Sequence, residues 1–448
     1  MSFPRYPKYK PSGVEWLGKV PEHWEVCALK RIISMQSGES ITAESIEESG
    51  HFPVFGGGGL RGYTSSFTHD GHFALIGRQG ALCGNINYGR GKFWASEHAV
   101  VASPIKQVEI MWLGEMMRAM NLNQYSVSAA QPGLSVDLVG RVVTVLPPLS
   151  EQTAIAALLD TETAKIDELV AEQRRLMDLL KEKRQAVISH AVTKGLNPNA
   201  PMKSSGIEWL GDVPEHWEVT RLKYLVANEN HAGIQTGPFG GMLTGVLYQD
   251  DGEFKVYGQE NVLSGDFEKG IRWIPGEQFE ALSNYRANSG DLLFTRKGSI
   301  GGCCRFPDTA RSGIIDSDTI RVSLKQEAIS HDFLLLAFKF SQYQEVQIQM
   351  MKRGAILSGL NSEVISNLII IAPPILEQFA IVTYLNTESS KFDTLTVEAQ
   401  RAIDLLQERR TALISAAVTG QIDVRADRDS FSEGLQRPPG RLISRQRA

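Results

Sequence analysis

The sequence predicts an α+β protein made by internal duplication. We expect two globular α/β domains separated by two long helices, with the helices paired as an antiparallel coiled coil around a pseudo-two-fold axis. Two observations lead to this fold class: a short Trp-containing phrase occurs twice, and a long segment with helical periodicity also occurs twice. The segments between these repeats differ in sequence and length. We therefore expect two domains of similar architecture whose variable segments differ.

The short phrase is "SGVEWLGKVPEHWEV" from Ser12, written again as "SGIEWLGDVPEHWEV" from Ser205. The long segment starts at Pro147 with "PPLSEQTAIAALL" and returns at Pro373 with "PPILEQFAIVTYL". Over 47 aligned positions the two long copies share 25 identical residues. A repeat of roughly 200 residues is too long for a solenoid unit, which spans about 20 to 50 residues. We therefore interpret the repeat as two copies of one domain, each with its spacer.

These repeats give the domain boundaries. We expect a first globular domain with its Trp-containing opening segment at 1–146, a first spacer helix at 147–196, a second globular domain at 197–372 and a second spacer helix at 373–420. Residues 421–448 have no counterpart in the first half, and their Arg and Pro content predicts a flexible C-terminal extension.

Composition narrows the class of protein. The chain has 448 residues, a formal net charge of −5 and four cysteines without metal-ligand spacing, which predicts a folded multi-domain protein with reduced thiols. No run of eighteen apolar residues occurs, so we expect a cytoplasmic location and no membrane partner. The net charge gives no general attraction to nucleic acid, and any basic patch must be local.

Each long repeat shows one apolar stripe at steps of three, four and seven residues, which predicts a helix with a coiled-coil seam. Proline pairs precede both segments, and Gly195 and Gly420 follow them, as expected at helix ends. A less specific alternative is two unrelated surface helices, each packed on its own domain. The expected seam consists of Ile155, Leu159, Ile166, Leu169, Leu176, Leu180 and Val187 in the first helix, and Ile381, Leu385, Phe392, Leu395, Leu406 and Leu413 in the second.

The variable segments carry the candidate binding residues. Short apolar runs such as "FALI" and "HAVVA" alternate with Gly-rich turns, which predicts short strands joined by loops. "RQG" in the first segment matches "RKG" in the second, and each places a cation beside glycine where a strand ends. Such turns suit contact with DNA, because glycine permits close backbone approach and arginine can bind guanine through two hydrogen bonds.

The candidate contact residues are Arg78, Gln79 and Gly80 in the first segment, and Arg296, Lys297 and Gly298 in the second. Arg61, Lys352 and Arg353 are second choices for phosphate contact. The alternative is an ordinary β-turn with a solvated arginine. Charge does not decide between them, because the first variable segment contains nine basic and nine acidic residues.

Catalytic and metal-binding motifs are not evident. The sequence contains no phosphate-binding loop, no methyltransferase NPPY or DPPY motif and no dinucleotide fingerprint. "EFK" at 253–255 matches half of a nuclease motif, and His69 with His72 has chelating spacing without an evident third ligand. We expect no catalytic residue, no metal site and no cofactor bound by this chain.

"EWLGxVPEHWEV", "IGRQGALCG", "GPFGGML" and "PPLSEQTAI" leading into a long helix resemble the specificity subunit of Type I restriction-modification systems. The resemblance covers about residues 12 to 420. It implies a non-catalytic DNA reader with two target recognition domains, each for one half of a split, asymmetric site, and spacer helices that fix the gap. It also implies partners: double-stranded DNA, two modification subunits that use S-adenosylmethionine to methylate adenine at N6, and restriction subunits that use ATP and Mg.

Two other classes of protein stay open at this stage. A coiled-coil scaffold or oligomerisation protein would show no sequence-selective DNA binding. A self-contained nuclease or methyltransferase would require a catalytic motif that the sequence does not show.

Overall fold

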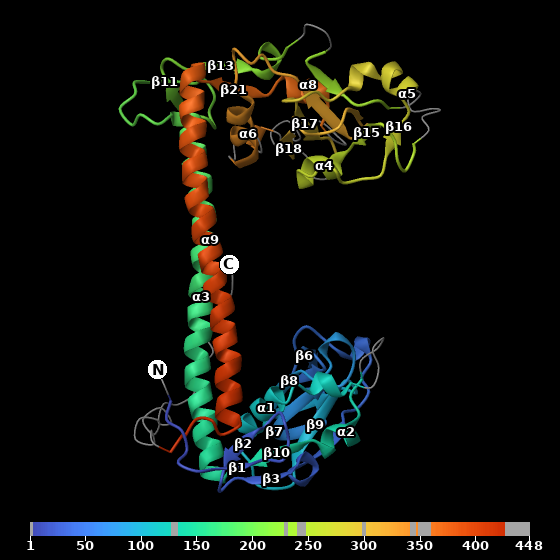
Figure 1. The fold of residues 1–448 in the computed structure, drawn as a ribbon, viewed down its shortest axis with the longest axis vertical. Coiled ribbons are helices and arrows are strands. Elements are labelled where there is room, and N and C mark those ends of the chain that lie inside the picture. Colours follow the sequence, from blue (N-terminus) through green and yellow to red (C-terminus); the bar gives the residue numbers. More distant parts are fainter. Residues whose placement is uncertain are drawn as a thin grey trace. The chain divides into compact units, whose positions relative to one another are not determined.

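The computed structural model describes residues 3–126, 133–227, 232–239, 248–297, 302–340, 346–347 and 360–425. The chain divides into two compact units, Met1–Arg174 with Gln400–Ala448, and Arg175–Ala399. Each unit contains one variable segment together with part of each long helix (Figure 1). The long helices are therefore divided between the units and do not form a separate domain.

Unit 1 is built around a six-stranded sheet of order β4-β9-β7-β8-β5-β6. All its pairings are antiparallel except that of β5 with β8. Helix α1 packs against β7 and β8. The elements of its globular part are β1 (Tyr9–Pro11), β2 (Lys19–Pro21), β3 (Glu25–Ala28), β4 (Ile33–Ser37), β5 (Phe52–Gly56), β6 (Gly59–Thr64), β7 (His69–Gly77), β8 (Ile86–Ala95), β9 (Ala99–Pro104), α1 (Ile110–Ala119), α2 (Val136–Arg141) and β10 (Val143–Leu146).

Unit 2 contains a four-stranded sheet of order β14-β20-β17-β18 and a three-stranded sheet of order β16-β15-β19. The elements of its globular part are β11 (Met202–Ser204), β12 (Asp212–Pro214), β13 (Glu218–Arg221), β14 (Ile234–Thr236), β15 (Phe254–Tyr257), α4 (Gln259–Ser264), β16 (Trp273–Ile274), α5 (Gly276–Ala281), β17 (Leu292–Thr295), β18 (Cys303–Arg305), β19 (Gly313–Ile315), β20 (Thr319–Val322), α6 (His331–Phe340), α8 (Ser362–Ser366) and β21 (Ile369–Ala372).

The two variable segments share a fold although their sequences differ. The order β4-β9-β7-β8 in unit 1 corresponds to β14-β20-β17-β18 in unit 2. Among the described strands, each unit also has one parallel pair, β5 with β8 and β15 with β19. The strand that leads into the spacer helix pairs with the strand after the Trp phrase in both units, β10 with β3 and β21 with β13. The predicted duplication therefore includes the variable segments.

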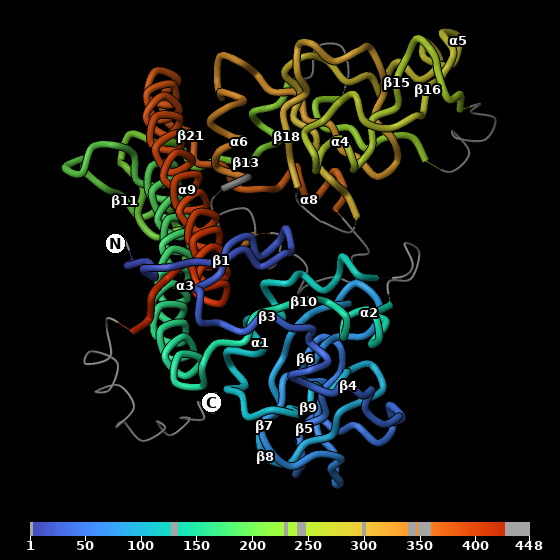
Figure 2. The backbone as a smooth tube through the Cα atoms, turned by 60° about the horizontal axis from the view of Figure 1, so that its bottom comes forward, coloured from blue at the N-terminus to red at the C-terminus, as the bar shows by residue number. Residues whose placement is uncertain are grey.

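The spacer helices are α3 (Leu149–Lys194) and α9 (Ile375–Val418). Both start directly after the predicted proline pairs, and Gly195 and Gly420 follow their ends with positive φ, as predicted for terminating glycines. Figures 1 and 2 show α3 and α9 running side by side in opposite directions. Across the described residues, neither these helices nor any other is long and apolar enough to cross a membrane.

Pairing of the helices is visible within each unit. In unit 1, Ile155, Leu159 and Ile166 of α3 share a core with Leu413 and Ala417 of α9. In unit 2, Ile188 and Val192 of α3 share a core with Ile381 and Leu385 of α9. The start of α3 thus packs against the end of α9, and the end of α3 packs against the start of α9. This is the antiparallel arrangement that the sequence predicts.

Two ion pairs between α3 and α9 are related in the same antiparallel way. Asp167 Oδ1 lies 3.6 Å from Arg410 Nε in unit 1, and Arg184 Nη1 lies 2.7 Å from Asp393 Oδ1 in unit 2. Asp167 and Asp393 occupy corresponding positions of the long repeat, as do Arg184 and Arg410. All four side chains are at least partly exposed, so the pairs set register more than they add stability.

Three of the predicted seam residues are wrong. Leu169, Leu176 and Leu395 are 44%, 42% and 45% exposed. Beyond Ile166 the covered face of α3 passes through Val170, Gln173 and Met177 instead. Heptad packing alternates steps of three and four residues, and a leucine one position early lies about 100° around the helix. The other predicted residues are buried (Ile155, Leu159, Ile166, Ile381, Leu385, Phe392 and Leu413) or half-buried (Leu180, Val187 and Leu406).

The repeated phrase has a structural explanation at the start of each helix. His23 Nε2 lies 2.7 Å from Glu151 Oε1, and Trp24 Nε1 donates to Glu151 Oε2 at 2.9 Å. In unit 2, Glu377 Oε2 contacts His216 Nε2 at 2.7 Å and accepts from Trp217 Nε1 at 3.0 Å. The "HW" of each phrase is therefore held by the glutamate of each "EQ".

The adjacent glutamine connects the helix start to a second helix. Gln152 donates to the Pro147 carbonyl and accepts from the backbone N–H of Glu109, which caps α1. Gln378 donates to the Pro373 carbonyl and accepts from the N–H of Ser330, just before α6. The duplicated motifs thus fix where each spacer helix leaves its globular neighbour.

The start of the predicted flexible extension is packed. Ile422 and Val424 are buried, and the backbone N–H of Asp423 donates to the Pro4 carbonyl at 2.8 Å. Tyr9 also donates to the Gly420 carbonyl. The prediction was wrong for residues 421–425, because their two aliphatic side chains complete the core of unit 1. Residues 426–448 lie outside the described residues.

Candidate nucleic-acid interface

We call segments 78–80 and 296–298 the Arg-Gly turns, and their first residues occupy corresponding places. Arg78 follows β7 and Arg296 follows β17. The N–H of Arg78 donates to the His98 carbonyl at 2.9 Å, and the N–H of Arg296 donates to the Asp318 carbonyl at 2.9 Å. Each turn therefore leaves its strand by the same backbone route, in agreement with the sequence comparison.

A loop distant in sequence completes each turn. The Arg78 carbonyl accepts from the N–H of Leu134 at 2.9 Å, and the Arg296 carbonyl accepts from the N–H of Leu360 at 2.8 Å. The residue after each leucine caps a short helix, Ser135 for α2 and Asn361 for α8. Sequence analysis missed these loops, although "GLS" and "GLN" stand at matching positions before the long repeats.

In unit 1 the polar groups of the candidate side chains are not bound to other described residues. Arg61 and Gln79 are exposed and Arg78 is half-buried. Within the described part of the chain, the side chains of these three residues form no hydrogen bond or ion pair. Gly80 has φ +75° and open space where a Cβ would stand, so its backbone conformation, and not crowding, favours glycine. Their polar groups are available to a ligand.

In unit 2 the corresponding side chains are engaged within the protein. Arg296 donates through Nε to the Leu360 carbonyl at 3.1 Å and through Nη1 to the Ser317 carbonyl at 3.2 Å. Its guanidinium also lies 5.8 Å from the ring centroid of Phe239. Lys297 Nζ lies 2.8 Å from Asp318 Oδ1. Arg296 thus holds three loops together, and DNA would compete with Asp318 for Lys297.

Three further candidates, Gly298, Lys352 and Arg353, lie outside the described residues. The structure adds exposed apolar side chains that sequence analysis passed over. Phe239, beside Arg296, is 60% exposed, and Leu82, just after Gly80, is 48% exposed. The signal in the sequence was a large apolar residue inside a Gly-rich loop.

The weaker motifs serve packing. His69 accepts or donates a 2.7 Å hydrogen bond with Thr68 and stacks on Phe93, and burial lowers its pKa. The buried Lys255 of "EFK" donates to the Glu268 carbonyl at 2.6 Å and lies over Trp273. Among the residues described, no three His, Cys, Asp or Glu side chains come together as metal ligands.

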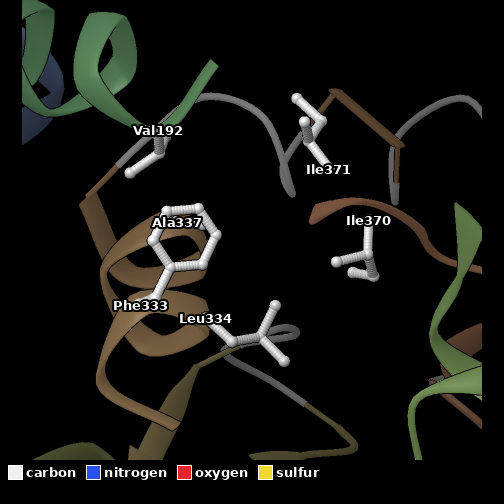
Figure 3. Close-up of a pocket in the computed structure, with 6 residues that line it drawn as sticks. All are labelled: Val192, Phe333, Leu334, Ala337, Ile370 and Ile371. Carbon is white, nitrogen blue, oxygen red and sulfur yellow. The ribbon is translucent and has the colours of Figure 1, made fainter. Parts of the chain in front are cut away.

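One enclosed pocket lies in unit 2, lined by Val192, Phe333, Leu334, Ala337, Ile370 and Ile371 (Figure 3). These side chains come from α3, α6 and β21, and all are aliphatic or aromatic. The pocket offers no polar group to a ligand. It marks where the end of α3 packs against the globular part of unit 2.

Comparison with known proteins finds one family in part of the chain and similar proteins over most of it. Residues 21–175 match the family described as Type I restriction modification DNA specificity domain. The EcoprrI specificity subunit of Escherichia coli is 47% identical over 136 residues, a match that spans 30% of this chain and 34% of that protein. A putative type I specificity subunit of Haemophilus influenzae is 25% identical, with 82% of this chain and 86% of that protein covered.

Solved structures agree at the level of fold. A chain of a type I restriction-modification system superimposes with a TM-score of 0.66 at 15% identity, covering 90% of this chain and 99% of its own length. The HsdS subunit of Thermoanaerobacter tengcongensis gives 0.51 at 15% identity, over 90% and 98% of the two chains. Residues 21–175 thus match a Type I DNA specificity domain, and most of the chain is similar to a putative specificity subunit of a Type I restriction enzyme. These comparisons favour that family over a coiled-coil scaffold.

Proposed function

We propose that this chain supplies the DNA sequence specificity of a Type I restriction-modification complex. Each unit reads one half of a bipartite, asymmetric site, and the two halves differ because the variable segments differ. The observation that carries the proposal is the matched pair of Arg-Gly turns, one per unit, held by the same backbone hydrogen bonds but surrounded by different side chains.

The matched turns explain specificity in physical terms. Because the two units share a backbone arrangement, each presents its loop to DNA in the same way. The side chains of the loop then determine which bases are bound. In the first unit Arg61, Arg78 and Gln79 are free to bind, and in the second Lys297 must exchange Asp318 for DNA. Lys352 and Arg353 are proposed as phosphate contacts of the second unit.

The partners follow from the family. We propose that the chain docks two modification subunits and, in the restriction complex, further restriction subunits, in the cytoplasm. Those partners would use S-adenosylmethionine, ATP and Mg, whereas this chain is the non-catalytic member of the complex and binds none of them. The purified chain should transfer no methyl group from labelled S-adenosylmethionine to DNA and should not cut DNA. Methyl transfer by the isolated chain would refute its non-catalytic role.

Selection from a randomised DNA library tests the proposal. The chain assembled with its modification subunit should enrich duplexes with two specified elements separated by a gap of fixed length and free sequence. Enrichment of one contiguous element, or of no sequence, would contradict it.

A further inference from the structure

The four-glycine turn of unit 1, Gly56 to Gly59, gathers side chains from three other positions. A Cβ on Gly56 would stand 2.5 Å from Arg61 Cδ, and one on Gly58 would stand 2.5 Å from Leu82 Cδ1. A Cβ on Gly59 would stand 3.0 Å from Asn87 Oδ1. A side chain at Gly56 or Gly58 would displace the flexible end of Arg61 or Leu82, and Gly59 has φ +108°, a backbone conformation that favours glycine.

The same turn lies against the Arg78 loop. A Cβ on Gly57 would meet the His98 carbonyl oxygen at 3.1 Å and the Arg78 nitrogen at 3.8 Å. Leu82 lies in that loop, at the end of a short 3₁₀ turn, and Asn87 follows it near the start of β8. The four glycines thus place Leu82 and Asn87 beside the residues already proposed to contact DNA.

Both side chains pack on the glycine turn with one part and leave another part open to a ligand. Leu82 exposes 48% of its surface, although a leucine gains by burial. Asn87 is half-buried, and its amide makes no hydrogen bond to any described residue. Because an amide both donates and accepts, this one can bind a ligand that offers a matching acceptor and donor.

We propose that Asn87 and Leu82 determine specificity in the first half-site, where Asn87 binds an adenine through its N6 and N7 positions and Leu82 contacts a thymine methyl group. An amide pairs with the major-groove edge of adenine through two hydrogen bonds, and an apolar side chain distinguishes thymine by its methyl group. This proposal rests on the proposed function, because it needs unit 1 to face DNA. It adds the bases that two particular side chains read.

The test uses the full chain assembled with its modification subunit and a duplex selected by that complex. Asn87→Ala should lower the preference for adenine at one position of the first half-site by roughly five- to 150-fold. Placing 7-deazaadenine at that position should weaken binding of the unchanged complex and leave Asn87→Ala unaffected. The second half-site should be read as before.

A second substitution guards against loss of folding. Asn87→Asp removes the amide donor and keeps the shape, so the preferred base at that position should change from adenine to cytosine, whose N4 amino group donates. A changed preference requires a folded, bound complex. If both Asn87 variants keep the original preference at every position of the first half-site, the assignment of Asn87 is wrong.

The contact between Leu82 and thymine is tested by removing apolar groups from either side of it. Leu82→Ala and replacement of thymine by uracil should each weaken binding about four-fold, and together no more than either alone. Leu138→Ala is the matched control, since Leu138 is 45% exposed in the same unit but does not pack on the glycine turn. Additive losses would refute the contact. A complex that selects no sequence at all would instead refute the proposed function.

Discussion

Glu151 shows how one residue accounts for a repeated phrase. Its carboxylate accepts from Tyr6 at 2.7 Å and from Trp24 at 2.9 Å, and contacts His23. Burial acts to raise the pKa of Glu151, but these hydrogen bonds outweigh burial and leave the pKa below its usual value. The charged form is therefore the one that the fold stabilises.

A pH dependence follows. Because the folded pKa of Glu151 is depressed, its stabilisation is present above the unfolded value of about 4.3 and is lost as pH falls through the folded pKa. Hydrogen exchange near Trp24, corrected for intrinsic rates, should show protection falling in this acid range. Glu151→Gln should weaken protection at neutral pH by about 1 to 3 kcal/mol and flatten the acid loss. Glu172→Gln, at an exposed position of α3, is the control, and an equal acid loss in Glu151→Gln would contradict the assignment.

Alanine substitution of the two arginines in the matched turns should have different effects on DNA binding and on folding. Arg78→Ala should disturb one half-site at a cost of about 1 to 3 kcal/mol, with little change in folding, since its side chain is unengaged. Arg296→Ala should disturb only the other half-site and also raise hydrogen exchange around Ser317 and Leu360, whose carbonyls it binds. Binding and salt titrations of the assembled methyltransferase measure this. A residue whose loss changes neither affinity, salt slope nor preference is a solvated turn residue.

At the scale of elements, the spacer helices were predictable and their packing face was less so. Proline pairs and terminal glycines placed α3 and α9 within two or three residues of their ends, because such signals act locally. The seam needed the partner helix. Leucines at 169, 176 and 395 satisfied an apolar pattern, yet the heptad phase set by Ile166 and its neighbours turned them outward.

A pair of substitutions separates the two faces of α3. Ile166→Ala should destabilise the helix pair by about 2 to 5 kcal/mol, because it removes a buried side chain from a packed seam. Leu169→Ala, one turn away and exposed, should stay within about 0.5 kcal/mol. Hydrogen exchange of the α3 amides reports both values. If Leu169→Ala costs as much as Ile166→Ala, the phase of the seam is different from the one described.

At the scale of the whole molecule, the duplication predicted the fold but only part of the candidate interface. The Arg-Gly turns were found because the sequence repeats them. The contribution of Leu134, Leu360 and His98 came from loops brought together by the sheet, which no local pattern records. The unequal engagement of Arg78 and Arg296 likewise depends on neighbours distant in sequence.

The helices are predicted to set the gap between half-sites. Seven residues inserted near Glu172 in α3 keep the heptad phase, and a matched insertion after Glu398 in α9 preserves the antiparallel pairing. Seven residues add about 10 Å of helix, equivalent to about three base pairs at 3.4 Å each. Library selection with the double insertion should give a longer gap between unchanged half-sites. An active complex with the original gap would show that the helices do not measure it.

Methylome sequencing tests the central claim most directly, that each unit of this chain reads one half of a DNA site. Cells that carry the chain with its modification subunit should show adenine methylation at one bipartite sequence, two short specified elements with a fixed gap. Arg78→Ala should relax one element and leave the other intact. Methylation at a single contiguous sequence, or simultaneous loss of both elements in Arg78→Ala with the protein still assembled, would contradict the account.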